Sequence, residues 1–184
     1  MKVVRLVLLL VVGLAPVTRL WGDDTDLIPS PSYFDFQGSQ SKWHEQAVKL
    51  PPYPAKTGLV PLQVDDSPFK YFIDPRALTV GAKDRVVRYT VVIVSSSGVR
   101  NVRYEGLRCD AHEYKTYAFG VNDGPFQRNT AAQWQEIHGI GTDRYRADML
   151  NQYACNGMLP RKNRAAILYQ IKYASSPVEQ PDYH

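Results

Sequence analysis

The chain has 184 residues, of which 44% are hydrophobic, 22% charged and 11% aromatic, a composition typical of soluble globular domains. This length allows one domain with a substantial core and excludes a multidomain enzyme. The two cysteines are too few for a disulfide-dense scaffold or an array of zinc ribbons, and the four histidines form no pair at metal-ligand spacing. We therefore expect neither a metal nor a cofactor.

The N-terminus has the pattern of a secretory signal peptide. Lys2 and Arg5 precede the apolar residues 6–15, a run shorter than the roughly 20 residues that a membrane-spanning helix needs. The sequence predicts a signal peptide over residues 1–22 and a periplasmic location, with no stable membrane span after cleavage. A membrane tether through an uncleaved signal is the alternative.

Removal of residues 1–22 changes the charge balance. It takes away three basic residues, so that 22 Lys and Arg become 19 against 18 Asp and Glu, and the net charge falls from +4 to +1. A nearly neutral chain gives no support for a nucleic-acid partner. The charge is nevertheless uneven, with a net −4 over residues 23–66 and +5 over residues 67–184. Either the acidic leader lies across the basic domain, or a basic face binds an anionic envelope partner.

The segment between the signal and the first strand predicts little regular structure. Residues 23–41 are rich in Asp, Ser and Pro, which predicts a flexible leader. Residues 41–50 carry apolar side chains at helical spacing, which predicts a short helix or turn. Residues 50–54 (LPPYP) must be extended, because proline restricts its own φ and the conformation of its predecessor. We expect this extended segment to lie over the domain.

The middle of the chain predicts an antiparallel meander. Four segments are rich in β-branched and aromatic residues and are separated by turns: residues 69–74, 85–94, 99–109 and 112–119. If residues 95–98 form a four-residue turn, Arg88 lies opposite Glu105. If residues 110–111 form a two-residue turn, Glu105 lies opposite Thr116, so that the three polar residues line up across three strands. The other face would then form the core: Val87, Tyr89, Val91, Ile93, Val102, Tyr104, Tyr117 and Phe119.

The last third of the chain predicts helices. Residues 130–133 (TAAQ) fit a capping box, and residues 160–172 predict a helix or, alternatively, a final strand. One apolar stripe fits a helix between them: Tyr145, Met149, Leu150 and Tyr153. Residues 174–184 predict a disordered tail. We therefore expect a single α+β domain over residues 42–173, with an antiparallel sheet of four or five strands covered on one face by C-terminal helices.

The two cysteines predict a disulfide, because an even pair in an exported chain is more often bonded than free. A bond between Cys109 and Cys155 would tie the end of a strand to the end of a helix and contribute up to about 4 kcal/mol by constraining the unfolded chain. Redox activity is the alternative, but no C-x-x-C pair supports it.

The search for catalytic motifs is negative. The sequence contains no nucleophile elbow, no zinc-protease motif and no phosphate-binding or dinucleotide-binding loop. Arg88, Glu105 and Thr116 form a candidate polar cluster, which is either a structural ion pair across strands or an anchor for a ligand. Three exposed aromatic side chains are candidates for contacts with a partner: Trp43, Tyr53 and Trp134.

Several blocks of the sequence form a pattern that covers most of the domain. The most specific blocks are residues 84–90 (DRVVRYT) and 104–109 (YEGLRC). Further blocks are Trp43-His44-Glu45, residues 50–54, Ser97-Gly98, residues 117–120 (YAFG), Trp134 and Tyr153-Ala154-Cys155. Over about residues 43–172 this pattern resembles the cryptic neisserial protein-like family of proteobacterial envelope proteins. The resemblance implies an exported protein and supplies no catalytic residue; the lipidated cysteine of some relatives is missing here.

The sequence thus favours an exported, non-catalytic binding or assembly factor whose partner is an envelope protein or polymer. The alternative is an envelope hydrolase in which Glu105 acts as general acid or base. The two hypotheses differ in what Glu105→Gln would change: turnover in the hydrolase, and stability, by about 1–3 kcal/mol, if Glu105 belongs to a buried ion pair.

Overall fold

The computed structural model describes residues 43–120 and 124–174. The predicted signal peptide and leader lie outside these residues, as do residues 175–184 of the predicted tail.

An antiparallel sheet forms the centre of the described part of the chain. Its strands are β1 (Val60–Leu62), β2 (Lys70–Ile73), β3 (Thr79–Val80), β4 (Val87–Val94), β5 (Arg100–Arg108), β6 (Glu113–Gly120), β7 (Phe126–Arg128) and β8 (Gln135–Glu136). The main path runs β1-β2-β4-β5-β6-β7, with β3 beside β4 and β8 beside β6. The predicted meander is confirmed, and the short strands β1, β3, β7 and β8 extend it beyond the expected four or five strands.

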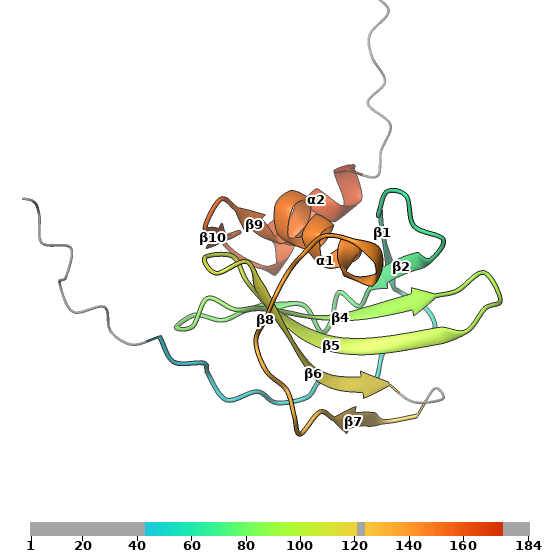
Figure 1. The fold of residues 1–184 in the computed structure, drawn as a ribbon, viewed down its shortest axis with the longest axis horizontal. Helices are drawn as coiled ribbons and strands as arrows, with labels where there is room; N and C mark the ends of the chain where they lie inside the picture. The colour runs from blue at the N-terminus through green and yellow to red at the C-terminus, as the bar shows by residue number, and fades with distance from the viewer. Residues whose placement is uncertain (1–42, 121–123, 175–184) are drawn as a thin grey trace, which may run out of the picture. The chain divides into compact units, whose positions relative to one another are not determined.

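Helices and a small hairpin cover one face of this sheet (Figure 1). In chain order they are η1 (Gly141–Asp143), α1 (Arg144–Asp148), the π-helix η2 (Met149–Ala154), the hairpin β9 (Cys155–Asn156) with β10 (Leu159–Pro160), and α2 (Arg164–Ala174). The predicted apolar stripe is confirmed, since all four of its residues are buried against the sheet. Residues 164–172 lie in α2, so the predicted helix is confirmed over this part and the alternative of a final strand is wrong; Ile167 and Ile171, one helical turn apart, are fully buried.

An extended segment covers the opposite face of the sheet. Residues 43–54, which we call the strap, run across this face (Figure 1). Val48 and Leu50 of the strap pack against a small cluster that includes Tyr104 and Tyr117. Gly120 makes room for the strap, since a Cβ atom there would lie 2.6 Å from the ring of Tyr53. The prediction that residues 50–54 lie over the domain is confirmed.

Two predicted helical segments are wrong. The described part of residues 41–50 is extended, because its polar groups bond to the turn before β4: the indole of Trp43 donates to the Asp84 carbonyl, and the Gln46 amide donates to the Asp84 carboxylate. The segment after the predicted capping box at residues 130–133 forms β8 and pairs with the start of β6. In both places long-range hydrogen bonds replace the local bonds of a helix.

The predicted register between β4 and β5 is wrong by one residue. Val94 lies opposite Arg100, because Val99 belongs to the loop: the Ser95 amide donates to the Val99 carbonyl, and the Ser95 hydroxyl accepts from the Val99 amide. A slip of one residue moves side chains to the other face of a sheet. Tyr89 therefore lies opposite Glu105, and Arg88 lies opposite Gly106.

This slip divides the predicted core into two layers. Alternate residues of β4 face the helices and join the main core: Val87, Tyr89, Val91 and Ile93. Tyr104 and Tyr117 belong to the smaller cluster beneath the strap, and Phe119 is 41% exposed. The register between β5 and β6 is as predicted, with Glu105 opposite Thr116, next to an irregularity at Tyr104.

The predicted disulfide is present. Cys109, directly after β5, is bonded to Cys155 at the end of η2. Both residues are buried in the main core. The bond therefore fastens the helical layer to the sheet.

Candidate functional site

The predicted polar cluster is divided between the two faces of the sheet. Glu105 and Thr116 face the helices, and the Thr116 hydroxyl donates to Glu105 at 3.0 Å. Arg88 faces the strap and pairs with Asp84 instead. The expectation that Arg88 lies opposite Glu105 is thus incorrect, because the loop between β4 and β5 is one residue longer than predicted.

Glu105 is the centre of a buried network between sheet and helices. Its side chain has no exposed surface, and it forms an ion pair with Arg146 of α1. The hydroxyls of Tyr89 and Tyr145 donate to it at 3.2 and 3.0 Å, and Arg146 Nε donates at 3.1 Å. Arg146 in turn lies over the ring of Tyr114, with 3.7 Å between the guanidinium carbon and the ring centroid.

Electrostatics keep the two phenols and the guanidinium of this network protonated. Burial, and then the charge of Glu105, raise the pKa values of Tyr89 and Tyr145, so both phenols stay protonated and act as donors. Burial alone would lower the pKa of Arg146, but the charge and hydrogen bonds of Glu105 outweigh it and raise that pKa. Both carboxylate oxygens of Glu105 are occupied and shielded from solvent. This geometry does not suit a general acid or base, which must reach a substrate.

A second charged cluster fastens the strap to the other face. Asp84 is buried and accepts hydrogen bonds from Arg88 and from the amides of Gln46 and Val86. Glu45 of the strap accepts from Lys115, Tyr117 and Trp134: the Lys115 ammonium at 2.9 Å, the Tyr117 hydroxyl at 2.6 Å and the Trp134 indole at 3.3 Å. A polar hollow of about 360 Å³ lies beside these residues and is partly lined by Arg128.

The stability of this cluster should depend on pH through Asp84. Burial alone would raise the pKa of Asp84, but Arg88 and the two amide donors outweigh it and hold that pKa below its ordinary value of 3.8. A carboxyl with a lowered pKa stabilises the fold above its ordinary pKa, and this contribution is lost as the pH falls through the folded value. We expect urea denaturation from neutral pH to about pH 3 to show a loss of stability that is smaller in Asp84→Asn. The exposed control Asp110→Asn should keep the wild-type profile; an unchanged profile in Asp84→Asn would contradict the expectation.

The three aromatic side chains that were predicted to be exposed are only partly exposed. Each ring is half-buried and used within the chain. Trp43 packs edge to face on Trp134 with 5.8 Å between centroids, and the guanidinium of Arg108 lies 4.1 Å over Trp43. Tyr53 packs on Phe126 at 5.3 Å. These rings help to hold the strap on the sheet, because their contacts with neighbouring side chains bury aromatic surface.

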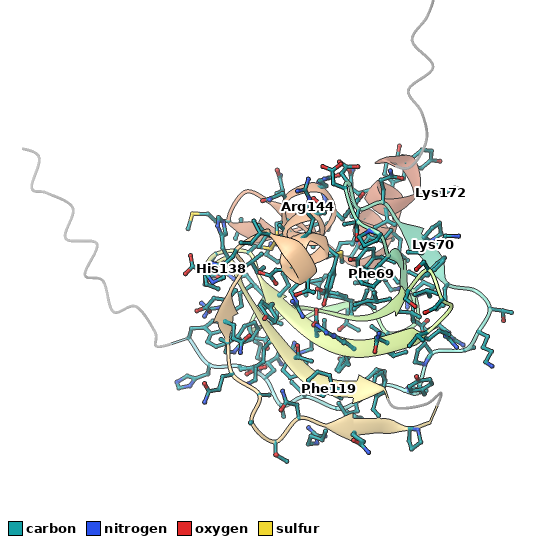
Figure 2. All side chains as sticks on the ribbon, turned by 45° about the vertical axis from the view of Figure 1, so that its right-hand side comes forward. Phe69, Lys70, Phe119, His138, Arg144 and Lys172 are labelled. Carbon is teal, nitrogen blue, oxygen red and sulfur yellow. A yellow bond between two sulfur atoms is a disulfide. The ribbon has the colours of Figure 1, made fainter. Side chains whose placement is uncertain are left out.

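A third feature, at the C-terminal end of the domain, was not predicted as a site. The hairpin β9–β10 and α2 line an open hollow of about 600 Å³. Apolar, aromatic and basic side chains lie in and around it, all of them exposed except the half-buried Arg161, and we call them the C-terminal face: Met158, Leu159, Arg161, Lys162, Tyr169, Lys172 and Tyr173. Figure 2 labels Lys172 on α2. No ion pair among the described residues includes Lys162 or Lys172.

The sequence contained signals for some of these residues. Arg146 lies on the same helical face as Leu150 and Tyr153, so a charge within an apolar stripe indicates a buried partner. From Met149 to Ala174 the chain has four basic residues and no Asp or Glu, which indicates a cationic surface. The role of Glu45 has no local signal, because its partners lie 70 or more positions away in sequence.

Within the described ranges, no group of His, Cys, Asp and Glu is arranged to hold a metal ion. The described helices also include none with the length and apolar character that crossing a membrane requires.

The fold is thus an α+β domain in which an antiparallel sheet lies between a helical layer and an extended strap. The sequence matches the CNP1-like family over residues 38–172, which is well over half of the chain. The chain belongs to this family. No curated protein and no solved structure matches the sequence.

Proposed function

We propose that this protein is an exported, non-catalytic binding or assembly factor of the cell envelope and that it meets its partner through the C-terminal face. The observation that carries the proposal is the uncompensated positive charge of this face beside exposed apolar side chains. Such a combination is typical of interaction surfaces, since monomeric soluble proteins seldom expose large apolar patches. The partner is therefore an anionic component of the cell envelope.

The charged clusters around Glu105 and Glu45 are paired within the chain, which favours a structural role for both. The C-terminal face is therefore the best candidate for a contact surface. Glu105 is neutralised by Arg146, and Glu45 accepts hydrogen bonds from three side chains. The hollow beside the strap is smaller, at about 360 Å³ against 600 Å³, and its Lys115 is paired with Glu45. A ligand there would have to compete with an internal ion pair.

The disulfide supports the proposed periplasmic location. Structural disulfides persist in oxidising compartments such as the periplasm and are rare in the cytosol of most organisms. The bond between Cys109 and Cys155 is buried, and so it fits a permanent structural role. With the signal-like residues 1–22 of the sequence, it favours export to the envelope.

Cell fractionation with matched lysine variants tests the proposal. In cells that express the full chain, Lys162→Gln combined with Lys172→Gln should move the exported protein, identified by intact mass, from the washed envelope fraction to the soluble fraction. Lys49→Gln combined with Lys83→Gln removes the same charge from exposed positions in or beside the strap and should leave the distribution unchanged. An equal shift for both pairs, or no shift for either, would refute the C-terminal face as the contact surface.

A further inference from the structure

The composition of the C-terminal face points to one kind of partner. We infer that this face docks on the surface of an anionic phospholipid bilayer, an inference that rests on the proposed binding function and names its partner. Three observations carry it: apolar side chains at a projecting hairpin, tyrosines on the outer side of α2, and unpaired lysines around them.

The hairpin β9–β10 presents apolar side chains to solvent at its tip. Met158 is 66% exposed and Leu159 is 52% exposed, directly after Gly157, whose positive φ of 61° forms the turn. Neither side chain belongs to the hydrophobic core. Exposed Met and Leu at the tip of a hairpin can enter the boundary between headgroups and acyl chains without changing the fold, because they contribute little to folding where they are.

The outer side of α2, next to this hairpin, carries two exposed aromatic side chains. Tyr169 and Tyr173 are separated by one helical turn, with 4.2 Å between ring centroids, and both are more than half exposed. They lie opposite the buried Ile167 and Ile171 on the helical wheel. Tyrosine is enriched at membrane interfaces because its ring is apolar and its hydroxyl is polar. Ala165 lies on the same side of the helix, and its small side chain leaves space beside Tyr169.

The charges around these side chains suit phosphate headgroups. Lys162 lines the hollow just before α2, and Lys172 lies on α2 beside Tyr173, so each lysine is close to one part of this face. Arg161 adds charge while its guanidinium donates to the carbonyls of Tyr153 and Gln152, which fixes its position. A long lysine side chain can place its stem on apolar surface and its ammonium among headgroups. With no carboxylate between Met149 and Ala174, nothing in this segment repels an anionic surface.

Vesicle co-sedimentation of the exported protein, purified from cells that express the full chain, tests the inference. The protein should partition onto vesicles of phosphatidylglycerol and phosphatidylcholine in equal parts, more weakly onto phosphatidylcholine alone, and less as salt is added. Each lysine near an anionic surface is worth about a factor of five, so Lys162→Gln with Lys172→Gln should weaken the partition onto anionic vesicles about thirtyfold. Met158→Ser with Leu159→Ser should weaken it about tenfold.

The control pair Lys49→Gln with Lys83→Gln should reduce the partition much less, and circular dichroism should show every variant folded. Equal losses in the two lysine pairs, or equal partition onto both kinds of vesicle, would overturn the inference, because binding would then follow net charge or general hydrophobicity. If fractionation in cells depends on the C-terminal face while purified vesicles do not bind, the lipid inference fails and the proposed binding function stands with a protein or polymer as partner. If neither depends on this face, both fail.

Discussion

Replacing Arg146 with Met should lower the free energy of unfolding by about 3–5 kcal/mol, because it leaves the Glu105 carboxylate buried without its counter-charge. Glu105 has no exposed surface, so its carboxylate has no contact with solvent in the folded protein that offsets the loss of the guanidinium. The remaining donors, Tyr89, Thr116 and Tyr145, are neutral hydroxyls and compensate only part of the loss. Urea denaturation at neutral pH measures the effect.

A neighbouring residue supplies the control for this prediction. Arg144, two positions earlier, pairs with Asp66 at the surface, where the two side chains are 39% and 87% exposed. Arg144→Met should therefore change stability by less than about 1 kcal/mol. Combining Glu105→Gln with Arg146→Met should cost less than the sum of the single variants, since the two groups interact directly. A loss below about 1 kcal/mol for Arg146→Met would contradict the buried pair, and loss of an enzymatic turnover with unchanged stability in Glu105→Gln would favour the hydrolase.

Removing the disulfide should have an effect of similar size. The bond closes a loop between residues separated by 46 positions, for which the chain-entropy estimate is about 4 kcal/mol. We expect Cys109→Ala with Cys155→Ala to lower the urea midpoint strongly, since the sheet and the helical layer lose their covalent connection. Reductant should destabilise the wild type to the same degree and leave the double variant unchanged. A midpoint that neither change moves would show that the bond contributes no stability.

Patterns of residue type along the sequence predict the main strands, the C-terminal helix and the disulfide. The β-branched run that forms β4 needs two buried faces, and the structure provides them. Ile167 and Ile171 are spaced for a helix that packs on one side, which is how α2 packs. The disulfide follows from an even pair of cysteines in a chain with a signal-like N-terminus.

The remaining features depend on contacts between residues far apart in sequence. One hydroxyl, that of Ser95, helps to extend the loop before β5 by one residue, and this places Glu105 and Arg88 on opposite faces. Glu105 finds its partner 41 positions later, on a helix whose contact with the sheet has no local signal. The strap is extended, and its Gln46 amide, which a helix would bond internally, donates to the Asp84 carboxylate instead. Sequence patterns therefore identify the elements, while tertiary contacts decide which charges meet.

Amide hydrogen exchange of the protein purified from cells that express the full chain, with and without envelope membranes from those cells, tests the role of the C-terminal face most directly. We predict that membranes slow exchange in residues 158–173, where the apolar, aromatic and basic side chains of this face gather. The strap, residues 43–54, should exchange at the same rate in both samples. Slower exchange in the strap with no change in residues 158–173 would contradict the proposal and would make the hollow beside Glu45 the contact surface.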